Sequence, residues 1–308
     1  MPLSREFDYL PVPDSPLPAP GCRVWVPFGR RRQVGVVLTH AQTSDLPANK
    51  MRSIAAAIDD TPLLSAADIE LIRFTSTYYH HPIGEVVAAA LPTLLRQGRP
   101  VHPTVETIAI TEVGEAADIE TLAKRAPRQA ELLELLVDSG GGGTEAERLT
   151  EELPHWRRAA KALFEKGYAT RFDACAADFD ERLGTAPTAG PTLNADQQLA
   201  LEALRASDRF AAYLLEGVTG SGKTEVYLAR MQDVIRNGKQ VLVLAPEIGL
   251  TPQLVARLRK RLGIDPAVLH SGLADVARLA AWRAARTGAA HLVVGTRSAI
   301  FTPMQNLG

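Results

Sequence analysis

The stretch Gly217-Val218-Thr219-Gly220-Ser221-Gly222-Lys223-Thr224 has the spacing G-x-x-x-x-G-K-T, which is a complete P-loop. The apolar run before it, Ala212-Tyr213-Leu214-Leu215-Glu216, predicts a buried strand, and the residues from Glu225 onward predict a helix. A strand, a glycine turn and a helix N-terminus in this order surround a phosphate chain with backbone N–H groups. Glycines suit such a turn because a side chain would block the close approach of the backbone.

The P-loop provides the first candidate site residues. Lys223 is expected to reach the β- and γ-phosphates of ATP, and Thr224 is expected to hold Mg²⁺ through its hydroxyl, so both are candidates for catalysis. Further nucleotide contacts are predicted for Gly217, Thr219, Gly220, Ser221, Gly222 and Glu225. A glycine turn that binds no phosphate is the alternative, and the flanking strand and helix patterns argue against it.

The composition is that of a globular protein. Of 308 residues, 46% are hydrophobic and 22% are charged, and the formal net charge is −1. Two or three domains fit this length, and nucleic-acid binding would have to use local basic patches or backbone amides. Cys22 and Cys175 have no metal-like spacing, which predicts a reducing compartment without a disulfide framework. We expect a cytoplasmic protein, because no signal peptide and no membrane-spanning run is recognisable.

Residues 1–100 predict a small, mostly β domain. Two β-branched runs, 22–27 and 33–39, flank a connection rich in glycine and arginine and favour a hairpin. Arg30, Arg31 and Arg32 would lie at its tip, where a solvated turn and a phosphate contact both remain open. The run 53–58 is a candidate third strand.

A helix is predicted over residues 65–79, with Ser65 as its N-cap and an apolar face of Ile69, Leu71, Ile72, Phe74 and Tyr78. It should end at His80 and His81, because Pro82 disfavours continuation. We assign these two histidines to packing and capping rather than to metal binding, since adjacent side chains point in different directions. A second short helix is expected over residues 86–91.

Residues 101–183 have the outline of a winged helix-turn-helix. The pattern predicts, in order, a strand at 105–111, helices at 124–137, 144–153 and 156–166, and a strand at 168–172. In that fold the third helix can enter a DNA groove, and here it carries Arg157, Arg158, Lys161 and Lys166. A helical spacer that packs against protein remains the alternative. Residues 184–191, rich in Ala, Pro, Thr and Gly, predict a linker.

Residues 192–308 alternate between strand and helix patterns, as a parallel α/β sheet requires. Asn194 and Gln197 have capping-box spacing at the start of a helix expected over 195–204. Strands are expected at 212–216, 240–245, 267–270 and 291–295, and helices at 225–236, 252–262 and 274–287.

Polar clusters follow three of these strands, at 246–251, 270–272 and 296–298. Ligands of parallel sheets bind at the carboxyl ends of strands, where helix N-termini and hydroxyls can grip phosphates without reading bases. Ordinary loop capping is the alternative for any one cluster, and three clusters after a P-loop favour the functional interpretation.

Taken together, these segments resemble the amino-terminal part of the PriA family of bacterial replication-restart helicases. The similarity is carried by residues 7–9, 23–29, 78–92, 217–227, 245–253, 269–271 and 294–301. It spans the chain, and the order and spacing of the segments distinguish it from other superfamily-2 helicases. The resemblance implies a 3′-end DNA-binding domain at 1–100, a winged-helix domain at 101–183, a linker at 184–191 and the first RecA-like helicase lobe at 192–308.

The resemblance also implies roles for individual residues. The first domain of the family holds the 3′ end of a nascent strand, and the resemblance assigns Phe7, Asp8, Tyr9 and Arg52 to that pocket. The family often has a lysine near the position of Arg52, and arginine keeps its charge but not its shape. Gln197 resembles an adenine-recognising glutamine, and a capping residue would not easily serve that role as well. DNA contacts at the strand ends are implied for Thr251, Thr296 and Arg297.

Two departures from the family pattern lower the expected activity. Only residues 1–6 precede the Phe-Asp-Tyr segment, where the family has an apolar strand. The family's acidic Walker B pair, zinc-binding cysteines and second lobe follow beyond position 308, so the lobe is expected to be truncated before Walker B. We therefore expect fork binding and weak nucleotide binding, but neither hydrolysis nor unwinding by this chain alone.

The first hypothesis is thus part of an ATP- and Mg²⁺-dependent 3′-to-5′ helicase that binds forked and single-stranded DNA. The family implies single-strand binding protein and primosome proteins as partners, and a cytoplasmic, nucleoid-associated location. One alternative is a non-catalytic module that binds DNA ends. Another is a different superfamily-2 P-loop translocase, which would not require a free 3′ end.

Overall fold

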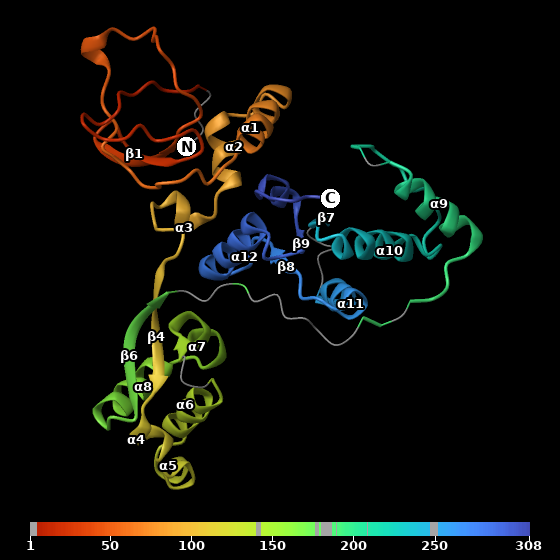
Figure 1. Ribbon diagram of the computed structural model, residues 1–308. Coiled ribbons are helices and arrows are strands. Elements are labelled where there is room, and N and C mark those ends of the chain that lie inside the picture. Colours follow the sequence, from red (N-terminus) through yellow and green to blue (C-terminus); the bar gives the residue numbers. More distant parts are fainter. Residues whose placement is uncertain are drawn as a thin grey trace. The chain divides into compact units, whose positions relative to one another are not determined.

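The computed structural model describes residues 5–139, 143–175, 179, 187–188, 190–207, 209–246 and 252–308. It divides into two compact units, of which the first contains Met1–Val101 with Asp178–Gly308 and the second contains His102–Ala177 (Figure 1). Among the described residues, no helix is both long enough and apolar enough to cross a membrane.

A three-stranded antiparallel sheet opens the first unit. Strands β1 (Arg23–Phe28) and β2 (Arg31–Val36) form the expected hairpin, and β3 (Ala56–Ala57) pairs with the other edge of β1. A short 3-10 helix, η1 (Ala48–Lys50), precedes β3. The turn consists of Gly29 and Arg30, because Phe28 pairs with Arg31, and the other two arginines of the predicted tip lie in β2.

One buried ion pair fixes β1 to the following helices. Arg23 is fully buried, and its Nη2 and Nε atoms donate to the two carboxylate oxygens of Asp59 at 2.7 and 2.9 Å. Its Nη1 atom donates to the carbonyl oxygens of Leu95 and Arg99 at 2.7 and 2.8 Å. A buried charge is tolerated only with such complete pairing, so we assign Arg23 a structural role.

Three helices follow, α1 (Ala66–Tyr78), α2 (Ile83–Ala90) and α3 (Thr93–Arg96). Ser65 caps α1 as predicted, in a capping box with Asp68. The predicted apolar face of α1 was wrong in part, because Ile69 and Ile72 are buried whereas Phe74 and Tyr78 are 58% and 65% exposed. Phe74 lies about 200° around the helix from Ile72, so one packed face does not bury both. It stacks on Tyr78 instead, at 5.3 Å between ring centroids.

The rest of the first unit is built on a parallel sheet. Strand β9 (Leu292–Gly295) lies between β7 (Val241–Leu244) and β8 (Ala267–Leu269), as the strand patterns at these positions predicted. The accompanying elements are α9 (Ala195–Arg205), α10 (Lys223–Arg236), α11 (Pro252–Leu262), α12 (Asp275–Thr287) and the 3-10 helix η3 (Arg297–Phe301).

Helices cover both faces of this sheet because alternate side chains of β9 point to opposite faces. Val293 packs with Ala281, Ala284 and Ala285 of α12. Its neighbours Leu292 and Val294 pack with Leu228 of α10 and with Leu258 and Leu262 of α11. Figure 1 shows α12 beside β8, and the two elements are in contact.

The strand expected at residues 212–216 does not form. Leu214 is 85% exposed and Tyr213 is 50% exposed, and no described strand pairs with this run. An apolar sequence becomes a strand only where a neighbour pairs its N–H and C=O groups, and the described sheet provides no such neighbour here. The prediction used apolar character alone and was therefore wrong.

The two parts of the first unit share a hydrophobic core. Leu279 and Trp282 of α12 pack in one cluster with residues of α1 and α2, among them Ile72 and Val86. The Trp282 indole N–H donates to the carbonyl oxygen of Ala90 at 3.0 Å, and Arg286 donates to the carbonyl oxygens of Pro62 and Leu63. The small β domain and the P-loop lobe therefore form a single packed body.

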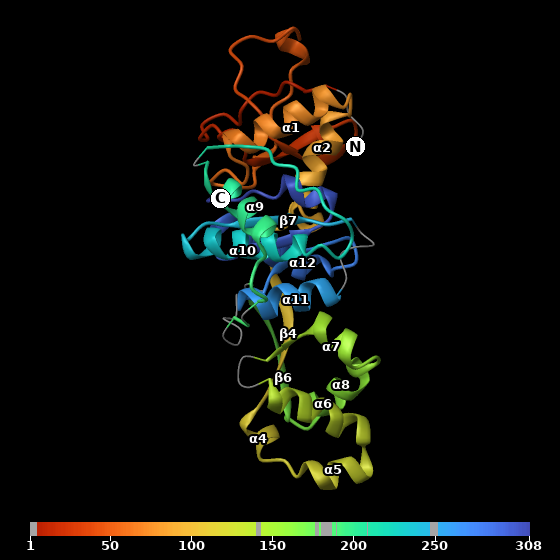
Figure 2. The same cartoon turned by 90° about the vertical axis from the view of Figure 1, so that its right-hand side faces the viewer.

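The second unit combines an antiparallel sheet with a helical core. Strand β4 (Thr104–Ile110) pairs with β5 (Thr144–Glu145) and with β6 (Ala169–Cys175), and Figure 2 shows β4 and β6 side by side. Its helices are α4 (Glu112–Glu115), α5 (Ile119–Arg125), α6 (Pro127–Asp138), α7 (Ala146–Glu152) and α8 (Trp156–Glu165).

Two expectations for the second unit need correction. The helix expected at 124–137 is interrupted at Ala126, because Pro127 disfavours a helical residue before it and begins a new helix. The helix expected at 144–153 starts at Ala146, because the two preceding residues form β5. The side chains of Leu132, Leu136, Leu149 and Leu163 nevertheless form one core, as the apolar pattern predicted.

Candidate functional site

The P-loop wraps around the N-terminus of α10. Gly220 and Gly222 have φ angles of +83° and +82°, a conformation that side chains disfavour, and Gly222 caps the helix that begins at Lys223. A turn of this kind directs backbone N–H groups and the positive end of the helix toward one space. Its backbone therefore fits a phosphate chain, and Thr224 in the first turn is the residue expected to hold Mg²⁺.

The Lys223 ammonium lies over the loop itself. Its Nζ atom donates to the carbonyl oxygen of Gly217 and, at 3.2 Å, to that of Val218. Neutral carbonyl oxygens stabilise the positive charge of an ammonium group less than anionic oxygens do. The position suits a lysine that exchanges these carbonyls for phosphate oxygens.

Gln197 forms the predicted capping box and also contacts the P-loop. Its Oε1 atom accepts from the backbone N–H of Asn194 at 3.0 Å, and its own N–H donates to Asn194 Oδ1 at 2.9 Å, which completes the expected capping box. Its Nε2 atom also donates to the carbonyl oxygen of Ser221, within the P-loop, at 3.0 Å. The amide oxygen and nitrogen are used separately, so capping does not prevent contact with the nucleotide loop.

Glu225, a predicted nucleotide contact, faces α11. Arg257 Nη2 donates to its Oε1 atom at 2.9 Å, and Arg261 Nη1 donates to its Oε2 atom at 2.5 Å. Burial raises the pKa of the Glu225 carboxyl, but the hydrogen bonds from Arg261 and Arg257 outweigh burial, so the pKa lies below its ordinary value. Both carboxylate oxygens are engaged, which gives Glu225 a helix-pairing role in this conformation.

A groove lies at the carboxyl ends of β8 and β9, bounded on its other side by α2 and α3. It has a volume of about 370 Å³, and its polar lining includes Thr93, Arg96, His270, Ser271, Thr296 and Ser298. Two of the three strand-end clusters predicted from the sequence therefore meet here. The third includes Thr251, which lies outside the described residues.

The remaining strand-end candidates differ in exposure. Thr296 is buried, and its N–H donates to the carbonyl oxygen of Leu269 at 3.2 Å, which ties the end of β9 to β8. Arg297, the next residue, is exposed at the start of η3. Arg278 of α12 donates to the carbonyl oxygens of Ser271 and Leu273 and so holds the turn that follows β8.

The residues assigned to the candidate 3′-end pocket lie beside the β1–β2 turn. The Tyr9 hydroxyl donates to the carbonyl oxygen of Pro27 at 3.1 Å, and the Phe7 ring meets Phe28 edge to face at 5.4 Å. Arg52 Nη1 donates to the carbonyl oxygen of Gly29 at 3.3 Å. Burial raises the pKa of Tyr9, and the Arg52 charge partly opposes that rise.

The exposed Asp8 carboxylate has one partner in this pocket. Ser44 Oγ donates to Asp8 Oδ2 at 2.6 Å, and Ser44 Oγ itself accepts from the Leu46 N–H at 3.1 Å. Phe7, Tyr9 and Arg52 thus contact Phe28, Pro27 and Gly29 around the β1–β2 turn, and Asp8 lies between Phe7 and Tyr9 in the chain. Leu10 pairs with Ser53 in a parallel β-bridge, which brings the segment that contains residues 7–9 next to Arg52.

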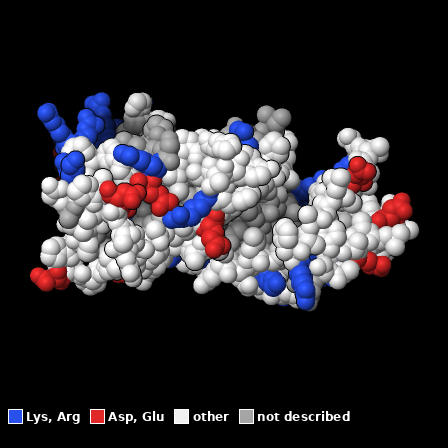
Figure 3. Space-filling view, turned by 90° about the horizontal axis from the view of Figure 1, so that it is seen from above, with Lys and Arg blue, Asp and Glu red and all other residues white. Residues whose placement is uncertain are grey.

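Figure 3 shows acidic and basic side chains interspersed on the surface that it draws, which fits the net charge of −1. No three His, Cys, Asp or Glu side chains gather into a metal-binding group within the described ranges. Contacts with nucleic acid would therefore depend on local groups such as those in the groove and the pocket.

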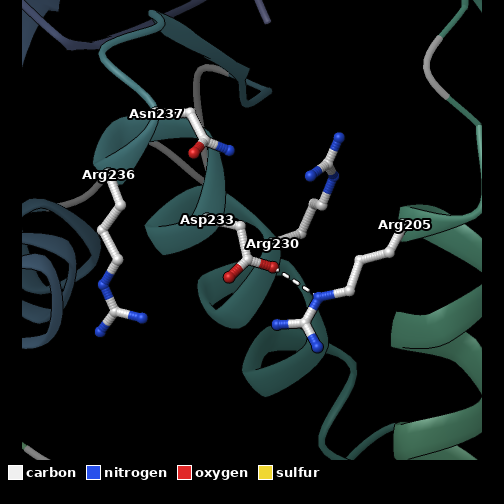
Figure 4. A pocket seen from close by; sticks show the side chains of 5 residues that line it. All are labelled: Arg205, Arg230, Asp233, Arg236 and Asn237. Carbon is white, nitrogen blue, oxygen red and sulfur yellow. Dashed lines mark hydrogen bonds and ion pairs between the residues drawn. The ribbon is translucent and has the colours of Figure 1, made fainter.

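A pocket rich in arginine lies at the other end of α10 (Figure 4). Arg205, Arg230 and Arg236 lie around Asp233, and Arg205 Nε donates to Asp233 Oδ2 at 2.7 Å. That hydrogen bond raises the pKa of Arg205 further above its ordinary value. Arg205 and Arg236 occupy the last turns of α9 and α10, where cations complement the helix dipoles, so this pocket joins the two helices.

Sequence reasoning missed three residues that complete these sites. Arg257 and Arg261 are four residues apart on α11, and this i, i+4 spacing of arginines is the signal that could have found them. Ser44 gave no sequence signal, because a single serine in a loop is common and its partner is 36 residues away.

Two family models match separate parts of this chain. A family model described as a 3′ DNA-binding domain matches residues 1–92, and one described as a DEAD/DEAH box helicase matches residues 194–307. The first match contains the candidate 3′-end pocket, and the second contains the P-loop and the strand ends.

The relatives of this chain include proteins named replication restart protein PriA. That of Haemophilus influenzae is 38% identical over 317 aligned residues, covering 100% of this chain and 42% of the relative. That of Bacillus subtilis is 30% identical over 373 residues, covering 99% of the chain and 46% of the relative. That of a Synechocystis strain is 50% identical over 118 residues, covering 38% of the chain and 14% of the relative. The chain thus spans less than half the length of each.

Proposed function

We propose, from the premise that this chain belongs to the PriA family of replication restart proteins, that it is the fork-binding and nucleotide-binding part of a DNA helicase. One observation carries the proposal. The domain that contains the candidate 3′-end pocket and the lobe that contains the P-loop, which different family models match, share one hydrophobic core through Trp282. DNA-end recognition and nucleotide binding therefore belong to the same packed body.

The pocket is assigned to a free 3′ end. Asp8 accepts a hydrogen bond from the terminal hydroxyl, Phe7 offers an aromatic surface for the last base, and Arg52 lies close enough to contact a backbone phosphate. A carboxylate also repels a terminal phosphate, so the pocket selects hydroxyl ends.

The P-loop is assigned to ATP with Mg²⁺. Backbone amides of residues 217–223 and Lys223 bind the phosphates, Thr224 holds the metal, and Gln197 lies beside the loop for the adenine. ATP supplies the free energy for strand separation, and this chain contributes the groups that bind and orient it. Unwinding in the 3′-to-5′ direction is proposed for the whole protein.

Single-stranded DNA is assigned to the strand-end groove, with Thr296 and Arg297 as contacts and Thr251 as a third. The second unit contributes a winged helix as an additional DNA contact, because α6, α7, α8 and the β4–β6 pair follow that outline. Single-strand binding protein and primosome proteins are the proposed partners, at the nucleoid in the cytoplasm. Zinc binding is proposed only for segments of the family's proteins that lie outside these 308 residues.

The pocket assignment is tested by fluorescence anisotropy on forked DNA that ends in either a 3′-hydroxyl or a 3′-phosphate. We expect the wild type to prefer the hydroxyl about tenfold and Asp8→Ala to lose that preference, because a hydrogen bond to a charged group is worth about 1.5–3 kcal/mol. Asp45→Ala removes the same charge from a neighbouring exposed position and should keep the preference. Equal binding of both ends by the wild type would contradict the assignment.

A further inference from the structure

The pocket at the carboxyl end of α10 holds more positive charge than its own contacts use. It is lined by Arg205, Arg230, Asp233, Arg236 and Asn237 (Figure 4). Its volume is about 360 Å³. Helix α10 has 14 residues, so this end of the helix lies about 20 Å from the P-loop at the other end. The pocket shares no lining residue with the groove at the strand ends, and it is therefore a separate place on the lobe.

The single carboxylate of the pocket is already paired. Arg205 Nε donates to Asp233 Oδ2 at 2.7 Å, and this ion pair links α9 to α10. The bond uses one of the five N–H groups of the guanidinium. The two Nη atoms of Arg205 donate to no acceptor in the part of the chain that the structure describes, so they are available to a ligand.

Arg230 has neither of the roles that explain the other arginines. Its half-buried side chain forms no ion pair or hydrogen bond with any described residue, and Figure 4 shows its guanidinium directed away from the Asp233 carboxylate. It lies six residues before the end of α10, outside the last turn in which a cation complements the helix dipole. Partial burial of a cation costs free energy, and no described contact within the fold offsets that cost.

The charges of the pocket leave a surplus of about one positive charge. Three guanidinium groups face one carboxylate and the carboxyl ends of α9 and α10, which each contribute about half a negative charge. This surplus matches the single negative charge of a phosphodiester better than the several charges of a nucleoside triphosphate. The Asn237 amide adds two neutral donors at the rim.

We propose that this pocket binds a phosphodiester group of a DNA strand. Arg230 and the Nη atoms of Arg205 donate to the phosphate oxygens, because a planar guanidinium matches two oxygens of one phosphate. Asp233 holds Arg205 in place, and Arg236 adds attraction at the exposed side. Such a contact positions the strand and reads no base. The proposal rests on the DNA binding proposed above and adds a site outside the 3′-end pocket and the strand-end groove.

The test compares Arg230→Gln with Lys260→Gln. The first change removes a charge from the pocket and leaves the ion pair between Arg205 and Asp233 in place. The second removes an exposed charge from α11, outside the pocket. The affinity of the 308-residue chain for an oligo-dT strand is measured by fluorescence anisotropy over a series of salt concentrations. The slope of log K against log salt then reports the number of phosphate contacts.

Arg230→Gln should weaken oligo-dT binding about tenfold at low salt, as the loss of a hydrogen bond to a charged group does. It should also reduce the salt slope by about 0.7, the value for one phosphate contact on a single strand. Arg230→Lys should keep the slope and bind more weakly than the wild type, because lysine keeps the charge but not the paired donors. Lys260→Gln should keep both the affinity and the slope.

The outcomes separate this inference from the proposed function. A wild-type chain that does not bind oligo-dT would contradict the proposed function. A chain that binds it, with the same affinity and slope in Arg230→Gln, would overturn the inference alone. Weaker binding with an unchanged slope would also overturn it, because no phosphate contact would then have been lost.

Other ligands of the pocket are tested with the same variant. Inorganic phosphate and an oligo-glutamate peptide are added separately, and the unfolding temperatures of the wild type and Arg230→Gln are compared. If either compound stabilised only the wild type while the two proteins bound oligo-dT equally, the pocket would belong to free phosphate or to an acidic protein segment. Stabilisation of neither protein, together with the reduced salt slope, is the result expected for a site that takes a DNA strand.

Discussion

At the scale of the residue, Lys223 is the most informative position. Its ammonium rests on the carbonyl oxygens of Gly217 and Val218, a weaker arrangement than contact with phosphate oxygens. Lys223→Ala is expected to weaken binding of a fluorescent ATP analogue about 10- to 100-fold, because hydrogen bonds to charged groups contribute about 1.5–3 kcal/mol.

Lys239→Ala provides the control for this prediction, since Lys239 is exposed beyond the end of α10 and lies outside the loop. It should bind the analogue with wild-type affinity. Equal affinity of Lys223→Ala and the wild type would remove the P-loop assignment, because the motif would then be a turn without a ligand.

Residues with short-range partners were predictable from the sequence. Ser65 and Asn194 are N-caps whose partners lie three residues away, and the sequence predicted the N-cap at Ser65 and the capping box at Asn194. The Glu225 pairs were not, because Arg257 and Arg261 are 32 and 36 residues away and any of several carboxylates could have paired with them. Packing of two helices decides such a pair, and a local pattern does not contain that information.

At the scale of the element, the contact between α10 and α11 should depend on pH. The pKa of Glu225 is lower in the folded chain than its ordinary value of 4.5. The carboxylate therefore stabilises the fold above the unfolded-state pKa, and this contribution is lost as the pH falls through the folded-state value. Arg261→Gln should lower the free energy of unfolding by about 3 kcal/mol near neutral pH, as breaking a buried pair does.

The same comparison at a pH below the folded-state pKa of Glu225 should give a smaller difference, because the carboxyl is then protonated in both proteins. Urea unfolding at the two pH values measures this. A difference that stays constant with pH would mean that Arg261 stabilises the helix pair through its aliphatic stem and not through Glu225.

Elements were predictable where their pattern was complete. Helix α11 begins and ends at the expected residues, because a proline marks its start and a glycine follows its end. The run at 212–216 has the composition of a strand but no partner in the described sheet. Strand formation depends on a neighbour, which a single run of sequence does not identify.

At the scale of the whole molecule, the arrangement of the first unit lay beyond sequence analysis. Trp282 and Ala90 are 192 residues apart, and their hydrogen bond joins segments that the domain prediction had separated. Helical patterns indicate which side chains are buried, but they do not identify the element against which those side chains pack. Family resemblance gave the order of the modules and left their shared core unpredicted.

That shared core gives the last prediction, which uses two buried tryptophans as a matched pair. Trp282 lies in the core of the first unit and Trp156 in that of the second, at 3% and 5% exposure. Each Trp→Ala change should cost about 3–5 kcal/mol in its own unit. Trp282→Ala is expected to lower the midpoint of the first unit's unfolding while leaving that of the second unit unchanged, and Trp156→Ala is expected to do the reverse.

Calorimetry, together with hydrogen exchange measured on peptides of each unit, distinguishes the unfolding of the first unit from that of the second. Because Trp282 serves the β domain and the P-loop lobe together, its loss should expose peptides from residues 62–91 and from α12 at the same denaturant concentration. If the β domain kept its protection while α12 lost it, the two modules would be separate bodies. DNA-end recognition could then not be transmitted to the nucleotide lobe through a common core.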